Sequence, residues 1–239
     1  MRRRQEDLIT GSDDDPAVGA YAPSIVIEAL ENQVTDARRQ RIREVLDRRL
    51  QSVTVVVDNL HDPHNGAAIV RSCDAFGVQS MHAIVSNEPF SAARAVARGS
   101  QKWVHIHQHR ASEECIESLK AAGFMMVATH PEGAFEPDDL ATIPRVALVL
   151  GNERVGISPE LSAACAHTVR VPMVGFVESL NVSVTTAILL HAACHRRPGD
   201  LSPVHWQALY ARALWLTVPR AAERVEAFAL QTGRIRAGC

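Results

Sequence analysis

The chain has 239 residues, of which 46% are hydrophobic and 22% are charged, a composition typical of a soluble globular protein with a sizeable core. Its net charge of −2 and pI of about 6.6 argue against a protein that binds nucleic acid through bulk positive charge alone. No apolar stretch is long enough to span a membrane, and Gln5-Glu6-Asp7 stand where a signal peptide would be apolar. Five scattered cysteines indicate free thiols, so we expect a cytoplasmic protein without a membrane segment.

Charge is distributed unevenly along the chain. Residues 36–50 hold six Arg against three acidic residues, and residues 196–239 hold seven Arg against three, whereas the rest of the chain is acidic. All but two of the 25 basic residues are Arg, which suits phosphate binding but also fits a biased genome. Within 36–50, apolar residues recur with helical spacing at Ile42, Val45, Leu46 and Leu50. This pattern predicts a basic helix, either solvated or facing RNA, and charge alone does not separate the two.

The alternation of apolar runs predicts the domain organisation. Residues 1–35 form a polar extension that we expect to be partly disordered, with a mobile tail over 1–23. From residue 53 the pattern alternates between strands and helices, which predicts an α/β domain with a mostly parallel sheet and helices on both faces. Two further helices, at 203–216 and 221–230, lie outside this core. The strands are expected at 53–58, 78–85, 124–129, 146–150 and 168–171, and the helices at 66–76, 111–122 and 180–195.

Three polar loops follow predicted strands, at 58–65, 151–158 and 171–183. Ligands of open α/β sheets bind beyond the carboxyl ends of the strands, so these loops are candidates for a binding site. Asn65 is expected to cap the helix that carries Arg71 six residues later. Taken singly, each loop is explained by caps and turns, and the order in which they occur is the informative feature.

These ordered segments resemble the three motifs of the SpoU/TrmH family of RNA ribose 2′-O-methyltransferases, within the SPOUT superfamily. The resemblance runs from about Arg41 to His195. The motifs are Asp62-Pro63-His64-Asn65 with Arg71-Ser72-Cys73-Asp74-Ala75-Phe76-Gly77, then Leu150-Gly151-Asn152-Glu153 with Gly156-Ile157-Ser158, and finally Pro172-Met173 with Gly175 and Ser179-Leu180-Asn181-Val182-Ser183-Val184.

The resemblance implies an α/β fold whose C-terminal part is tied in a trefoil knot, and a homodimer with active sites near the subunit boundary. It implies a methyltransferase domain over 36–195 with a leading basic helix, followed by a C-terminal helical extension over 196–239. The methyl donor is S-adenosylmethionine, and the implied acceptor is the D-loop guanosine at position 18 of tRNA. Ribosomal RNA, and a non-catalytic RNA-binding role of the same fold, are the alternatives.

The resemblance also assigns site residues. An arginine side chain stays protonated at neutral pH, so Arg71 is expected at least to hold a phosphate and stabilise the developing alkoxide charge; whether it also accepts the proton stays open. Asn65 and Asn181 orient Arg71 and the ribose by hydrogen bonds. Glu153 holds the geometry of the second motif or pairs with a cationic partner, and Ser179 supports the loop over the donor. The donor is held largely by backbone groups. The implied catalytic residues are Asn65, Arg71, Glu153, Ser179 and Asn181, and the implied donor-binding residues are Thr129, Gly151, Val171 and Leu180.

Two sets of histidines have spacings that could bind zinc. His105, His107 and His109 alternate along one strand face, and His191 and His195 are one helical turn apart. No further ligand is evident for either set, so structural or solvent-exposed histidines are favoured and no metal site is predicted.

Overall fold

The structure, a computed structural model, describes residues 21–85, 99–152 and 154–234. The predicted mobile tail therefore falls almost wholly outside the described residues. The chain divides into two compact units, one formed by Leu50–Pro198 and the other by the chain up to Arg49 together with the chain from Gly199. None of the helices in the described ranges is both long and apolar enough to cross a membrane.

The first unit, Leu50–Pro198, is built on a six-stranded sheet in the order β3-β2-β1-β5-β4-β6. Every pairing in it is parallel, which confirms the predicted parallel α/β sheet. Buried β-branched and aliphatic residues fill the central strands, as expected where helices cover both faces. The strands are β1 (Leu50–Asp58), β2 (Val78–Ile84), β3 (His105–His109), β4 (Met125–Thr129), β5 (Val146–Leu150) and β6 (His167–Val169).

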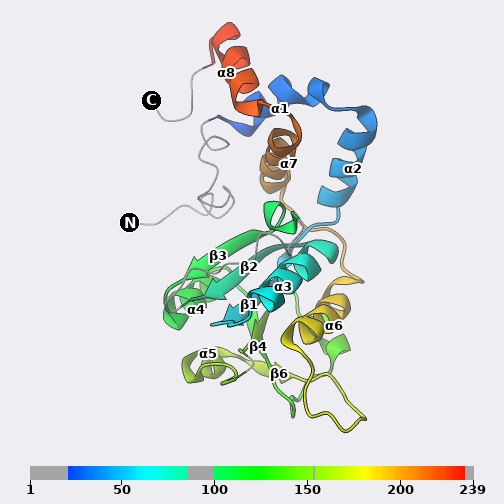
Figure 1. Ribbon diagram of the computed structural model, residues 1–239, viewed down its shortest axis with the longest axis vertical. Helices are drawn as coiled ribbons and strands as arrows, with labels where there is room; N and C mark the ends of the chain where they lie inside the picture. Colours follow the sequence, from blue (N-terminus) through cyan, green and yellow to red (C-terminus); the bar gives the residue numbers. More distant parts are fainter. Residues whose placement is uncertain (1–20, 86–98, 153, 235–239) are drawn as a thin grey trace. The chain divides into compact units, whose positions relative to one another are not determined.

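Helices cover both faces of this sheet (Figure 1). On one face, α3 (Pro63–Ala75) and α6 (Val182–Cys194) pack side by side and bury Ile69 and Leu189 against the strands. On the other, α4 (Ser112–Ala121) and α5 (Pro159–Ala164) bury Leu119 and Leu161. Short 3-10 helices, η4 (Ser100–Lys102) and η5 (Pro137–Thr142), complete the unit. Because consecutive strands are parallel, their carboxyl ends share one edge of the sheet.

The second unit is helical. It contains α1 (Pro23–Leu30), η3 (Glu31–Gln33), α2 (Asp36–Leu46), α7 (Pro203–Thr217) and α8 (Ala221–Gln231). α1 packs against α7 and α8, and α2 packs against α7. Tyr210 is buried on α7 and donates its hydroxyl to Glu31 Oε1 at 2.7 Å, while Arg43 lies over its ring. The two ends of the sequence therefore share a core.

Most predicted elements are confirmed within a few residues, including the end of α4 at Gly123, whose φ of 75° is the left-handed conformation of a helix-terminating glycine. The expectation that Asn65 caps its helix is wrong. Asp62 is the cap and accepts a hydrogen bond from His64 N at 2.8 Å, because Pro63 fits the first helical position. Asn65 instead lies buried in the first turn of α3. α1 and α5 were not predicted.

Candidate functional site

A cavity of about 740 Å³ lies at the carboxyl ends of β4, β5 and β6. Three chain segments, separated in sequence but adjacent at one edge of the sheet, supply most of its wall. They are the end of β4 with residues 128–131, the loop after β5 with residues 150–152 and 154–157, and the segment between β6 and α6 with residues 168–171 and 178–182. The volume falls within the about 300–1,000 Å³ typical of small-molecule sites.

All four residues expected to hold the donor line this cavity. Thr129 ends β4, Gly151 follows β5, Val171 follows β6, and Leu180 precedes α6. These positions are far apart in the sequence. They lie together because β5 is placed between β1 and β4 in the sheet. The cavity wall is therefore built from loops that are far apart in the sequence.

The loop after β5 is closed by its own backbone. Asn152 N donates to Gly156 O at 3.2 Å, and Gly156 N donates to Asn152 O at 3.1 Å. The Asn152 side chain accepts from the amides of Arg154 and Val155. At Gly151 an added Cβ would lie only 2.2 Å from the carbonyl carbon of Gly156, so the loop needs glycine there. Glu153, expected to be catalytic, lies outside the described residues.

A buried carboxylate ties this loop to the end of β1. Asp58 is 2% exposed, and its Oδ2 accepts a hydrogen bond from Ser158 N at 2.7 Å. Asn59, which has a positive φ of 48°, donates its side-chain amide to Asp58 Oδ1 at 3.0 Å. No role is predicted for Asp58 from the sequence. A signal was present, because an acidic residue ends an otherwise apolar strand.

Asn181 joins the third loop to the first. Its Oδ1 caps α6 by accepting from Ser183 N at 2.8 Å and from Ser183 Oγ at 2.6 Å. Its Nδ2 donates to Asn65 Oδ1 at 3.0 Å, across a sequence separation of 116 residues. Asn65 is only 8% exposed, so its side-chain amide is bound by Asn181 and is largely shielded from water. Two of the expected catalytic residues are therefore in direct contact, at the edge of the cavity that Asn181 lines.

The remaining expected site residues are placed less directly. Ser179 lines the cavity. Arg71 is exposed on α3 and does not belong to the cavity wall as far as the described residues define it. α3 nevertheless packs against α6, so the helix that carries Arg71 neighbours the helix that Asn181 caps.

Charges of both signs border the cavity. Arg154, Arg170 and Glu178 belong to its wall, and the Arg170 guanidinium lies 3.4 Å from Glu136 Oε1. A ligand with both cationic and anionic groups would find partners here. The arrangement combines several loops with a few charged side chains, which is typical of small-molecule sites.

Comparison with known protein families decides the classification. The SpoU rRNA Methylase family matches residues 52–191, more than half of the chain. The chain belongs to the SpoU methylase family. All three cavity-forming segments fall inside the matched range, so the site lies within the family domain.

Individual SpoU proteins agree with this assignment. The tRNA (guanosine(18)-2′-O)-methyltransferase of Thermus thermophilus is 39% identical over 164 residues, which cover 68% of this chain and 84% of that protein. The crystal structure of the TrmH/SpoU tRNA modifying enzyme of A. aeolicus has a TM-score of 0.68 and 32% identity, and the match covers 77% of this chain and 98% of that one. An AdoMet-bound rRNA methyltransferase from Sinorhizobium meliloti has a TM-score of 0.56 and 29% identity, covering 64% and 59% of the two chains.

The close approach at Gly151 generates the first prediction. We expect Gly151→Ala to weaken binding of S-adenosylhomocysteine, the demethylated form of the implied donor, by at least about tenfold, because the new methyl group displaces the loop that closes at Gly156. Isothermal titration calorimetry measures the affinity. Gly175→Ala is the matched control, because a Cβ there meets no atom within 4 Å. Equal affinities for both variants would contradict the assigned cavity.

Proposed function

We propose that this SpoU protein transfers a methyl group from S-adenosylmethionine to a ribose 2′-hydroxyl of RNA, and that its substrate is guanosine 18 of tRNA. The observation that carries the proposal is the convergence of the segments after β4, β5 and β6 on one cavity, at whose edge Asn181 binds Asn65 in the first turn of α3. The likeness to the Thermus thermophilus tRNA methyltransferase supports the choice of substrate.

The cavity suits the donor. Gly151 leaves the space beside Gly156 that a side chain would fill, and the backbone groups at Thr129, Val171 and Leu180 border the same cavity. Backbone amides and carbonyls in such loops can bind the edge of an adenine ring. When bound, S-adenosylmethionine supplies a methyl group already activated on a sulfonium sulfur. The protein's task is then to align the hydroxyl with that methyl group.

Arg71 is assigned to the acceptor side of the reaction. An arginine side chain stays protonated at neutral pH and presents a planar fork that matches a phosphate. We assign it to hold a backbone phosphate next to the target ribose and to stabilise the charge that develops on the 2′-oxygen. The linked side chains of Asn65 and Asn181 orient the ribose. Glu153 supports the second loop and Ser179 supports the third.

The helical unit supports an RNA substrate. α2 exposes Arg38 and Arg41, and the exposed Arg48 follows the helix. This basic segment is available for contact with phosphates, which position a nucleic acid without reading its sequence. Ribosomal RNA is the second candidate substrate, because the similar Sinorhizobium meliloti structure carries that description. A tRNA substrate would place the protein in the cytoplasm.

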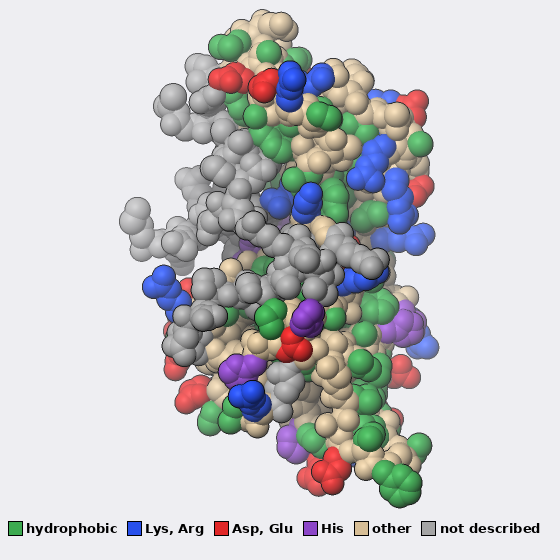
Figure 2. Space-filling view, in the orientation of Figure 1, with side chains coloured by type: hydrophobic (Ala, Val, Ile, Leu, Met, Phe, Trp, Pro, Cys, Tyr) green, Lys and Arg blue, Asp and Glu red, His purple; other side chains and the backbone are tan. Residues whose placement is uncertain are grey.

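We also propose a homodimer and a knotted C-terminal part of the first unit. Val174 and Phe176 are fully exposed between β6 and α6, and Val184 and Ile188 are partly exposed on α6. Hydrophobic side chains gather at the lower right of the face in Figure 2, the region where Figure 1 places the loop before α6. Exposed apolar patches of this kind mark interaction sites. A second copy would cover the patch and place α3, with Arg71, near the subunit boundary.

The function is tested with the purified protein, labelled S-adenosylmethionine and an unmodified tRNA transcript. We expect one methyl group per transcript, on the ribose of guanosine 18, and no transfer to a matched transcript with 2′-deoxyguanosine at that position. Arg71→Ala is expected to reduce transfer by at least about a hundredfold, while S-adenosylhomocysteine affinity changes little. Arg71→Lys keeps the positive charge but lacks the planar fork of the guanidinium, and we expect it to reduce methyl transfer by at least about tenfold.

Three outcomes would contradict parts of this proposal. Transfer to ribosomal RNA but not to tRNA would overturn the substrate. Near-full turnover of Arg71→Lys with an unchanged pH profile would overturn the role of Arg71. Absence of transfer to any RNA, together with absence of donor binding, would overturn the activity itself.

The dimer is tested by sedimentation velocity. We expect the wild-type protein to sediment as a dimer and Phe176→Glu to sediment as a monomer with impaired methyl transfer, because the carboxylate cannot be buried against a second copy. Leu230→Glu is the control, since Leu230 is equally apolar and 78% exposed but lies on α8. A monomeric wild type, or a dimeric Phe176→Glu protein, would contradict the proposed interface.

A further inference from the structure

A cluster of histidines lies on the sheet face that α4 covers, outside the methyl-transfer cavity. The register of β2 and β3 pairs His82 with His107 and Ile84 with His109. Because side chains alternate along a strand, His105, His107 and His109 all lie on the same face as His82. Cys115 of α4 packs on this face together with Ile84. Residues from β2, β3 and α4 therefore meet at one buried point.

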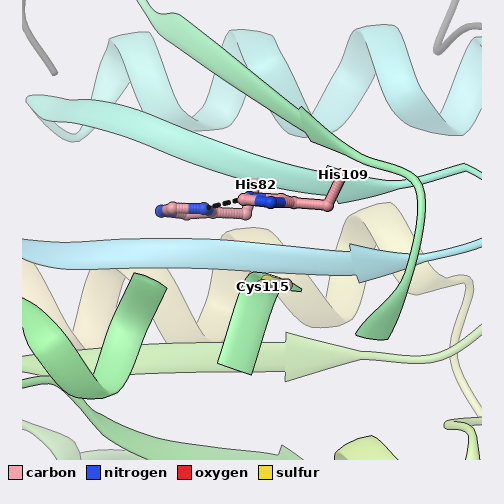
Figure 3. Close-up of side chains that lie close together, drawn as sticks. All are labelled: His82, His109 and Cys115. Atoms are coloured by element: carbon pink, nitrogen blue, oxygen red, sulfur yellow. Dashed lines mark hydrogen bonds between the residues drawn. The ribbon is translucent and has the colours of Figure 1, made fainter. Parts of the chain in front are cut away.

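Three potential metal ligands meet there (Figure 3). His82 and His109 are 5% and 6% exposed, and Cys115 is fully buried. One ring nitrogen of each histidine and the Cys115 sulfur lie within 4.8 Å of one another. His82 Nδ1 and His109 Nε2 face each other at 2.8 Å in nearly parallel rings. Figure 3 shows this pair beside the sulfur-bearing helix.

The electrostatics of the cluster favour neutral imidazoles. Burial, with the neighbouring His109 and His105, lowers the pKa of His82 to about 3. Burial also lowers the pKa of His109, which the carboxylate of Glu114 only partly offsets. A neutral imidazole has the lone pair that a metal ion needs. Burial, with the negative charges of Asp58 and Glu114, raises the pKa of the Cys115 thiol to about 12.

One polar atom in the cluster is unsatisfied. His109 Nδ1 is buried and has no hydrogen-bond partner among the residues that the structure describes, and Glu114 Oε1 lies 4.0 Å away. Unsatisfied buried nitrogens are rare in folded proteins and call for an explanation. Histidines that bind a metal through one nitrogen usually present the other as an N–H to a carboxylate. The position of Glu114 beside His109 Nδ1 matches that arrangement.

We propose that His82, His109 and Cys115 form a binding site for a single Zn²⁺ ion, with Glu114 as the carboxylate partner of His109. Zinc is bound in proteins by imidazole nitrogens and cysteine thiolates, and three protein ligands leave its fourth tetrahedral position to a water. The sequence shows no further ligand beside the alternating histidines. The fold supplies the further ligands, since His82 comes from the neighbouring strand and Cys115 from the helix above.

Binding requires a small rearrangement and a defined loss of protons. Zinc–nitrogen bonds of about 2.0–2.1 Å in a tetrahedral site place two nitrogens about 3.3 Å apart, so the rings move apart from their hydrogen-bonded distance. The proton between them moves to the outer nitrogen of its ring, which for His109 is the Nδ1 that faces Glu114. The Cys115 thiol releases one proton to solvent as the Zn–S bond forms. The ion then links α4 to β2 and β3.

The site is tested on the untagged, full-length protein after chelator treatment under reducing conditions. We expect calorimetry to show one Zn²⁺ per chain, with about one proton released when buffers of different ionisation enthalpy are compared. Co²⁺ is expected to give a thiolate charge-transfer band. Cys115→Ser is expected to abolish that band and to weaken Zn²⁺ binding at least about a hundredfold, since even loss of an outer partner costs 10- to 100-fold.

Two matched variants control for other sites. Cys165→Ser removes a partly buried thiol from the same sheet face, and His191→Ala removes an exposed histidine that stacks on His195. Both should bind Zn²⁺ like the wild type. Absence of the Co²⁺ charge-transfer band in the wild type would overturn the proposal, even if Cys115→Ser does not fold. Equal Zn²⁺ affinity in wild type and a folded Cys115→Ser protein would overturn it as well.

Discussion

The side chain of Asn181 makes two kinds of hydrogen bond at once, and the site depends on both. Its oxygen caps α6, and its nitrogen binds Asn65 in the first turn of α3. A cap and a neutral hydrogen bond each contribute about 1 kcal/mol. A fully buried leucine such as Leu189 contributes about 1.5–3 kcal/mol. Asn181 therefore does not hold the domain together. It fixes where α6 begins relative to α3, and so how the third loop meets the first.

The parallel sheet supplies the remaining constraint. Because β4, β5 and β6 end at one edge, three loops of modest length can enclose a cavity without a separate lid domain. Gly151 allows the start of the loop after β5 to lie against the backbone of Gly156 in the same loop. The buried side chain of Asp58 anchors the end of that loop to β1. In the proposed function, the loops around the cavity bind the donor, and side chains outside its wall, such as Arg71, contact the RNA. Such an arrangement is consistent with a methyltransferase whose difficult step is the positioning of a weak nucleophile, the ribose 2′-hydroxyl.

The sequence predicted the sheet well because its strands are continuous apolar runs and its loops contain turn residues. The prediction of the start of α3 was wrong because Asp62 and Asn65 are both residues that can cap a helix. Pro63 favours a start three residues earlier, and Asn65 then lies inside the helix and binds Asn181. α1 was not predicted because it follows a polar extension, and α5 has only six residues. Periodicity placed His109 on a strand face, but no local pattern relates His82 or Cys115 to it. Such long-range pairings require the strand order and register.

Hydrogen–deuterium exchange with saturating S-adenosylhomocysteine tests most directly whether the three loops form one donor site. The account predicts slower amide exchange in residues 128–131, 150–157, 168–171 and 178–182 together, with the helical unit and the β3–α4 region unchanged. Protection confined to one of these loops, or found only away from them, would contradict a donor site built from their convergence.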